Sequence, residues 1–242
     1  MNETIRQLHE RKSVRVFEER KIGEAEKRAI LQAACQAPSA GNQQLYTILD
    51  VTDPAIKEQL VRTCDNQPFI ADASMVLIFC ADCKKWYDAF LDAGCEPRSP
   101  GVGDLLLAVS DANIAAQNAV TAAQSLGIGS CYIGDIMENC EEQRALLHLP
   151  PYVFPAAMLV FGYPTEQQLR RPKPRRADLA HIVHENTYRT MDGEELSTLF
   201  SIRAEQKPYR DYMQAFCARK YNSDFSIEMT RSVGEYLKQF TR

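Results

Sequence analysis

The sequence predicts one mixed domain of helices and strands, and three observations lead to this fold class. The runs 73–81 and 156–162 are continuously apolar and have the length of strands buried on both faces. Residues 104–126 are rich in Ala, Leu and Val almost all round, which predicts a long helix in a core or at a subunit interface. Other helical patterns alternate with strands, so periodicity alone leaves a doubly wound α/β fold open.

The remaining elements follow from local patterns in chain order. Residues 4–9 are expected to form a short helix with Ile5 and Leu8 inward, and a second helix opens at 22–24 and stops at Pro38. No internal repeat and no interdomain linker is evident. The other expected elements are a strand at 45–51, a helix at 53–64, a strand at 74–80, a loop at 96–103, a strand at 130–133, a helix at 141–147, a strand at 156–162 and helical segments from 194 onward.

The bulk composition is that of an ordinary globular protein: 242 residues, 45% hydrophobic and 25% charged. A net charge of −4 argues against nucleic acid or an anionic membrane as a partner. Charged residues interrupt the N-terminus, which therefore does not read as a signal peptide, and no apolar run approaches the ~20 residues of a membrane span. We expect a cytoplasmic protein.

Eight cysteines are scattered along the chain, and without a secretory signal we expect reduced, partly buried thiols. Cys80 and Cys83 form a CxxC pair, but no second pair and no HxxxH lies at a suitable spacing, so no metal site is expected. The four histidines form no HExxH motif and no Ser/His/Asp arrangement. No hydrolase nucleophile is therefore visible.

Residues 11–17 carry the first chemical signal, because three cations and one hydroxyl lie within five residues. In an extended chain, Ser13 and Arg15 would point to one side, and Val14 and Val16 to the other. A guanidinium group offers a planar fork of donors that matches a phosphate, and a serine hydroxyl adds one more donor. The segment is therefore a candidate anion cradle, with a solvated basic turn as the alternative.

Three further segments accompany this cradle along the chain. Residues 37–44 form a loop of small polar residues, 132–135 (Tyr-Ile-Gly-Asp) end a strand, and Lys173-Pro174-Arg175 lies in a strongly basic stretch. The glycines near residue 130 are wrongly spaced for GxGxxG, and no P-loop lysine follows them. Nucleotide-binding folds with a known glycine fingerprint are therefore disfavoured.

In this order, the four segments resemble the nitroreductase superfamily of flavoproteins, and within it the branch of NADPH-dependent flavin reductases and oxygen-insensitive nitroreductases. The resemblance runs from the N-terminus through residues 184–188 and thins over the last fifty or so. It implies an α+β sandwich with an antiparallel-dominated sheet flanked by helices. It also implies a single domain over 1–242, with a helical C-terminal extension from about 190, and a homodimer with FMN at the interface.

The resemblance places the FMN phosphate among Arg11, Ser13, Lys173 and Arg175. A phosphate monoester carries about two negative charges near neutral pH, and these positions supply three cations from two distant segments. Lys12 would meet the phosphate or ribityl region, where histidine or arginine often stands in the family. For Lys173 and Arg175 a solvated basic loop is the alternative.

The resemblance also assigns residues around the flavin ring. Arg15 would reach the pyrimidine edge, where a fixed cation stabilises the reduced form, and the amide of Gln67 would contact the ring. Ile133, Gly134 and Asp135 would present a backbone N–H to flavin N5, although the family often carries a second glycine where Asp135 stands. The neighbouring subunit would line the flavin with its small loop residues Ser39, Ala40, Gly41 and Asn42.

The activity implied is that of an FMN-dependent NAD(P)H oxidoreductase working by ping-pong exchange. The donor reduces the flavin and leaves, and then a small-molecule acceptor (a nitroaromatic, a quinone, an azo compound or free flavin) takes the electrons. The flavin does the chemistry, so no catalytic side chain is expected.

NADPH is the expected donor, with NADH as the alternative. Arg203 is the first candidate for contact with the 2′-phosphate of NADPH, followed by Arg210 or Arg219.

Two alternative functions stay open. One is a specialised superfamily member, such as a reductive dehalogenase or an enone reductase, with residues 84–102 as a lid. The other is a flavin-binding protein without turnover.

Overall fold

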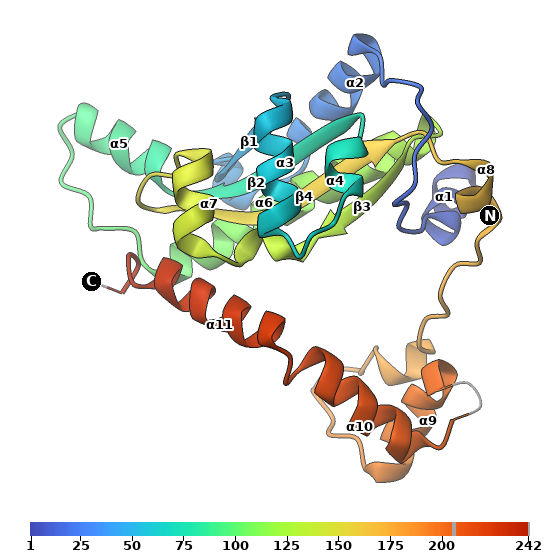
Figure 1. Cartoon of the computed structure of the whole chain (residues 1–242). Helices are drawn as coiled ribbons and strands as arrows, with labels where there is room; N and C mark the ends of the chain where they lie inside the picture. Colours follow the sequence, from blue (N-terminus) through green and yellow to red (C-terminus); the bar gives the residue numbers. More distant parts are fainter. Residues whose placement is uncertain (205–206, 242) are drawn as a thin grey trace. The chain divides into compact units, whose positions relative to one another are not determined.

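Four antiparallel strands form the sheet of the computed structural model, which describes residues 1–204 and 207–241 (Figure 1). Every neighbouring pair is antiparallel, so the doubly wound α/β alternative is excluded and the α+β class is confirmed. The strands, in their order across the sheet, are β1 (Tyr46–Asp50), β2 (Met75–Asp82), β4 (Val153–Gly162) and β3 (Gly129–Ile133).

Helices cover both faces of this sheet, because the central strands are apolar on both sides. On β2, Leu77 and Phe79 face one hydrophobic cluster, and Val76 and Ile78 face a second. The first cluster is closed by α6 (Val102–Ser125) and α2 (Glu24–Cys35), and the second by α3 (Pro54–Thr63), α4 (Phe69–Asp72) and α7 (Cys140–Leu147).

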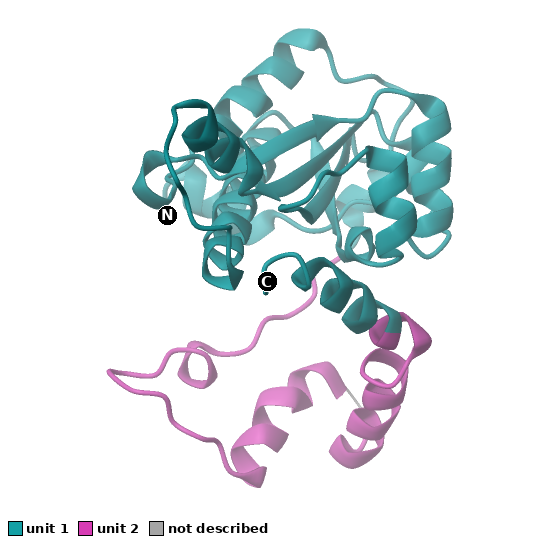
Figure 2. Cartoon of the chain, turned by 90° about the vertical axis from the view of Figure 1, so that its left-hand side faces the viewer, with its two compact units in different colours: residues 1–171, 228–242 teal, residues 172–227 magenta. Residues whose placement is uncertain are grey.

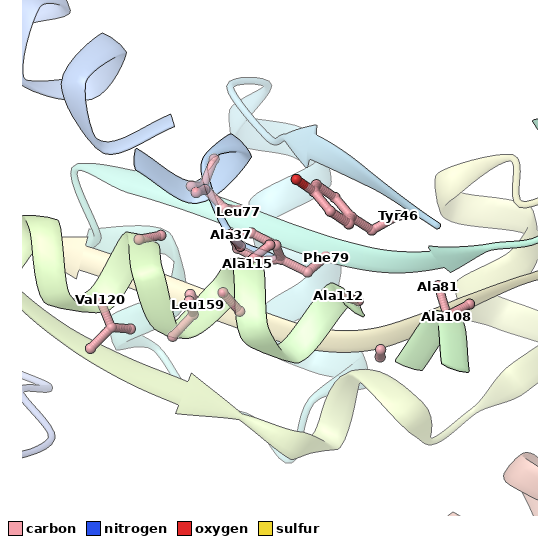
Figure 3. Close-up of a cluster of buried hydrophobic side chains, with 14 of the residues drawn as sticks. Ala37, Tyr46, Leu77, Phe79, Ala81, Ala108, Ala112, Ala115, Val120 and Leu159 are labelled. Atoms are coloured by element: carbon pink, nitrogen blue, oxygen red, sulfur yellow. The ribbon is translucent and has the colours of Figure 1, made fainter. Parts of the chain in front are cut away.

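Helix α6 packs on the sheet through a stripe of small side chains, among them Ala108, Ala112 and Ala115 (Figure 3). Small side chains let the helix backbone approach the strands closely. The sequence predicted a helix that is apolar almost all round, but only one face of α6 is buried. On the opposite face Leu106 is 62% exposed and Leu107 is 52% exposed.

Some shorter helices differ from expectation. The first helix forms as expected, but Ile5 and Leu8 are exposed, so their predicted inward orientation was wrong. The sequence reading did not anticipate α4 or α5 as helices. The other helical elements are α1 (Glu3–Glu10), η1 (Ala40–Asn42), α5 (Lys84–Asp92), η2 (Gly134–Met137), α8 (Glu166–Arg170), η3 (Leu179–His181), α9 (Gly193–Ala204), α10 (Tyr209–Lys220) and α11 (Asp224–Leu237).

The chain divides into two compact units (Figure 2). The first contains residues 1–171 and the C-terminal residues from Glu228, and therefore the whole sheet; the second contains residues 172–227. A single domain over the whole chain stays a prediction. Among the described residues, no helix combines the length and the apolar character that a membrane crossing requires.

Two glycines of the sheet leave space in which the N-terminal basic segment packs closely. The Val14 amide donates to the Ser130 carbonyl at 3.0 Å, and Val14 packs on Gly129, where a Cβ would come within 2.7 Å of it. Phe17 covers Gly162 in the same way, at 2.6 Å. Val16 is exposed, so the expected burial on that side of the segment holds for Val14 and fails for Val16. The segment meets the sheet through isolated bridges and forms no continuous strand.

Replacing Gly162 by Ala should therefore loosen this segment. The added methyl group would overlap the Phe17 ring, and overpacking of this kind costs about 1–3 kcal/mol. Urea unfolding should show that loss. Gly234→Ala, inside α11 with no atom within 4 Å of the new Cβ, is the matched control and should gain about 0.5–1 kcal/mol. An unchanged unfolding free energy for Gly162→Ala would contradict the packing argument.

Candidate functional site

Three of the predicted anion-binding residues gather around one thiol of β3. Burial raises the pKa of the Cys131 thiol, and the charge of Arg15, hydrogen bonding by Ser13 and the charge of Arg11 oppose that rise. The bridge between Ser13 and Ser130 sets this register. Two guanidinium groups and one hydroxyl therefore lie near one another at the β3 edge of the sheet.

Arg11 also lies over an aromatic ring of the same strand. Its guanidinium carbon is 5.9 Å from the centre of the Tyr132 ring. Burial raises the pKa of Tyr132 to about 12, and the charge of Arg11 opposes this rise. The ring keeps the guanidinium group close to the strand, where the charge stays half-buried.

Lys12 has structural partners. Its Nζ donates to the Leu169 carbonyl at 2.7 Å and also to the Arg171 carbonyl, both at the C-terminal end of α8. A lysine there satisfies carbonyl groups that a helix end leaves without partners. Lys12 thus holds the basic segment to the chain that follows the sheet, and its contact with a phosphate stays a prediction.

Arg15 lies near the turn that carries Gln67. Its guanidinium carbon is 5.9 Å from the centre of the Phe69 ring, and its backbone N–H donates to Gln168 Oε1 at 3.3 Å. The Gln67 side chain donates to the Cys64 carbonyl at 2.9 Å, which closes the turn before α4. The structure therefore places Arg15 and the Gln67 turn in one neighbourhood.

The residues predicted to meet flavin N5 leave β3 and enter the short helix η2. Ile133 is buried, whereas Gly134 is exposed, and a Cβ added to Gly134 would meet no atom within 4 Å. Protein packing thus leaves this glycine open on its Cβ side. Asp135 is half-exposed beside it.

Glu138, which the sequence reading did not single out, follows directly and is 94% buried, since its relative exposure is 6%. Burial raises the pKa of Glu138 to about 7, and the charges of Asp135, Asp65 and Glu228 add to the rise. Its Oε1 accepts no hydrogen bond from the described part of the chain. Near neutral pH this carboxyl group is therefore protonated in about half of the molecules, which limits the negative charge at this end of β3. The only sequence signal was an acidic residue close after the Gly-Asp pair.

The loop of small residues has an unusual backbone. Gly41, Asn42 and Gln44 all have positive φ angles, of 55°, 56° and 49°. The Ser39 hydroxyl accepts a hydrogen bond from the Gln44 amide at 3.0 Å, and the Trp86 indole donates to the Gln43 carbonyl at 2.8 Å. The loop therefore holds a conformation that L-residues adopt only when surrounding contacts enforce it.

The predicted flavin-contacting residues lie at opposite edges of the sheet. The loop at 39–42 leads into β1, whereas the basic segment lies against β3 and residues 133–135 continue from its end, and both β2 and β4 lie between these strands. Strands are spaced by about 4.8 Å, so the two edges are separated by roughly 14 Å. One chain therefore carries the two halves of the predicted site on different edges.

The remaining predicted residues belong to the second unit. Lys173 is half-buried and Arg175 is exposed, and Arg203 is exposed in the last turn of α9. Arg11 and Ser13 belong to the first unit, so the grouping of Lys173 and Arg175 with them stays a prediction.

The segment 84–102 borders the loop of small residues. The rings of Trp86 and Phe90 are tilted by 47° to each other with centres 5.7 Å apart, and Arg98 pairs with Asp104 at 2.6 Å. A cavity of about 280 Å³ lies between α5, α6 and the loop. Three aromatic side chains, Trp86, Tyr87 and Phe90, line this cavity together with polar groups that include the Arg98–Asp104 pair.

The cysteine pair is buried and poorly ionised. Burial raises the pKa values of Cys80 and Cys83 to about 12 each. Residues 1–204 and 207–241 contain no group of three or more His, Cys, Asp or Glu side chains that could hold a metal ion. These thiols therefore act as small core residues.

Comparisons with known proteins identify the family. Residues 8–163 match the Nitroreductase family. An oxygen-insensitive NADPH nitroreductase of Salmonella typhimurium is 35% identical over 198 residues, which are 81% of this chain and 79% of that protein. An FMN reductase (NAD(P)H) of Bacillus subtilis is 29% identical over 242 residues, 99% of this chain and 92% of that protein.

Solved structures agree. The nitroreductase NfrA1 of Bacillus subtilis superimposes with a TM-score of 0.81 at 25% identity and covers 98% of each chain. The NADPH:FMN oxidoreductase of Vibrio harveyi, complexed with NAD⁺, superimposes with a TM-score of 0.78 at 25% identity over 99% of each chain. The family match spans well over half of the chain and includes the sheet and the basic segment. The chain belongs to the Nitroreductase family.

Proposed function

We propose that this chain is an FMN-dependent NAD(P)H oxidoreductase of the nitroreductase type. The observation that carries the proposal is the convergence of Arg11, Ser13 and Arg15 around Cys131 of β3, the strand that leads into the open Gly134. Relatives named FMN reductase and oxygen-insensitive NADPH nitroreductase support the same activity.

The residues at this edge fit FMN. Arg11 and Ser13 supply a guanidinium fork and a hydroxyl for a phosphate, and Lys173 and Arg175 would complete the set. Arg15 would place a fixed positive charge at the pyrimidine edge, where it stabilises negative charge on the reduced cofactor. Gly134, with no atom within 4 Å of an added Cβ, leaves room for a ring to approach the backbone.

FMN, when bound, supplies the hydride chemistry, so the chain itself needs no nucleophile and no general base. The chain's own residues bind, orient and set the local charge. Asp135 and the partly protonated Glu138 would set how negative the N5 side of the site is. The aromatic cavity beside the loop of small residues favours flat acceptors such as nitroaromatics, quinones and flavins.

A homodimer would unite the two half-sites. The loop at 39–42 of one copy would meet the β3 edge of the other, which a single sheet keeps apart. The exposed leucines of α6 provide an apolar face for that association.

A visible absorption spectrum tests the core of the proposal. The purified protein should show the absorption bands of oxidised flavin; NADPH should bleach them and menadione should restore them. Flavin bands that NADPH leaves unchanged would indicate a flavin-binding protein without turnover. A colourless protein that takes up no added FMN would overturn the proposal.

Arg175→Ala should purify largely as apoprotein. One charge-assisted contact to a phosphate contributes on the order of 1.5–3 kcal/mol, which corresponds to roughly a tenfold to hundredfold loss of FMN affinity. Fluorescence titration with FMN measures that loss. The adjacent Arg176→Ala is the matched control, because that side chain was not assigned to the phosphate and donates to the Pro174 carbonyl. Full FMN occupancy of Arg175→Ala at micromolar protein would show that the assignment is wrong.

Leu106→Glu should convert the dimer into monomers and lower FMN occupancy. A charge at the centre of an apolar interface leaves that face unable to associate without desolvation. Sedimentation of the wild type and of the variant measures the molecular mass in solution and so distinguishes dimer from monomer. Leu169→Glu, on α8 and equally exposed at 61%, should leave the dimer intact. A wild type that sediments as a flavin-loaded monomer of 27.4 kDa would end the dimer proposal.

Arg203→Ala should reduce the preference for NADPH over NADH. A single charge-assisted contact to the 2′-phosphate can supply the ~1.4 kcal/mol that corresponds to a tenfold preference. The values of kcat/KM for both donors, in the wild type and in the variant, measure it. Equal wild-type values would refute the NADPH assignment, and an unchanged preference in Arg203→Ala would move the role to Arg210 or Arg219.

A further inference from the structure

The loop of small residues is tied at both ends to one side chain of α6. Asp111 Oδ1 accepts a hydrogen bond from the Ala40 amide at 2.9 Å, and Asp111 Oδ2 accepts one from the Leu45 amide at 3.1 Å. These amides belong to the first residue of η1 and to the residue just before β1. The carboxylate thus joins the two ends of the turn that contains Gly41 and Asn42.

Asp111 is an unusual residue at this position. It is 97% buried, since its relative exposure is 3%, and it lies within the alanine stripe that packs on the sheet. A carboxylate buried among alanines is costly unless donors satisfy its oxygens. Here each oxygen has a backbone N–H donor, and both donors come from the same loop.

The loop needs such an anchor because its backbone is strained. Three of its residues, Gly41, Asn42 and Gln44, have positive φ angles, and two of these carry a Cβ. Conformations of this kind cost of order 1–3 kcal/mol per non-glycine residue unless surrounding contacts enforce them. A carboxyl group whose two oxygens each accept a backbone N–H can enforce this shape, whereas a side chain with a single acceptor cannot do so at both ends.

We propose that Asp111 is a positioning residue for the cofactor: it holds the loop at 39–44 in the shape that receives the flavin. This inference rests on the proposed FMN-dependent function. Asp111 itself lies on the buried face of α6 and touches the loop backbone. The opposite face of the same helix carries Leu106 and Leu107, the surface proposed for self-association. One helix therefore both anchors the loop and presents it to the other copy.

Asp111→Asn tests the role with almost no change in volume. Asparagine keeps one acceptor and turns an N–H₂ group toward the second backbone N–H, so one end of the loop loses its partner. The Kd for FMN should rise at least tenfold, while the far-UV circular dichroism spectrum stays that of the wild type. Because bound FMN holds the loop itself, kcat at saturating FMN should return to within about twofold of the wild-type value, so the defect appears in binding alone.

Val76→Ala is the control for stability. Val76 is fully buried in β2 and faces the second hydrophobic cluster, a different one from the cluster that α6 closes beside the loop. The cavity left by this substitution should lower thermal stability at least as much as Asp111→Asn does, while the Kd for FMN stays within about twofold. An equal rise in Kd in both variants would reduce the role of Asp111 to general stability and overturn the proposal.

Amide hydrogen exchange tests the same idea in the wild-type apoprotein, without any variant. The Ala40 and Leu45 amides should already be protected before FMN is added, and free-peptide exchange rates there would overturn the proposal. A wild type that binds FMN, together with an Asp111→Asn variant that binds it equally well, would overturn the role of Asp111 alone. A wild type that binds no FMN would overturn the proposed function and this role with it.

Discussion

The close approach of α6 to the antiparallel sheet is the interaction on which the rest of the structure depends. Ala108, Ala112 and Ala115 leave so little side-chain volume between helix and strands that the helix axis is fixed relative to all four strands. The same approach brings Asp111 within hydrogen-bond distance of the loop that enters β1. It also turns Leu106 and Leu107 of α6 outward, so core packing and an exposed apolar face come from one helix.

The second constraint is that the residues proposed to contact the cofactor are divided between the two edge strands, β1 and β3. At the β3 edge, Gly129 and Gly162 give the N-terminal segment a surface without side chains, and Val14 and Phe17 close on it. At the β1 edge, the strained loop is held by contacts from α6 and from Trp86. An antiparallel sheet with two central strands keeps these edges apart, and this geometry is the physical reason to propose that two copies build one site.

The charge distribution is compatible with the proposed binding of an anionic cofactor. Guanidinium groups are grouped at the β3 edge, while the carboxyl group of Glu138 is pushed toward its neutral form by burial and by its acidic neighbours. Both effects favour an anion in that region. The buried thiols of Cys80 and Cys83, with pKa values of about 12, contribute packing and offer no thiolate for redox exchange.

Local patterns in the sequence determined the main strands and the long helix, because each depends on side chains close together in the chain. The order of four short segments along the chain indicated the Nitroreductase family. Strand direction, the exposure of Val16 and the one-sided burial of α6 depend on contacts between distant segments, so only the tertiary structure decided them. Asp111 shows the limit most clearly. In the sequence it is one polar residue in an alanine-rich helix, and its two partners lie 66 and 71 residues away. A carboxylate acquires a role from the donors that folding brings to it, and no local pattern contains those donors.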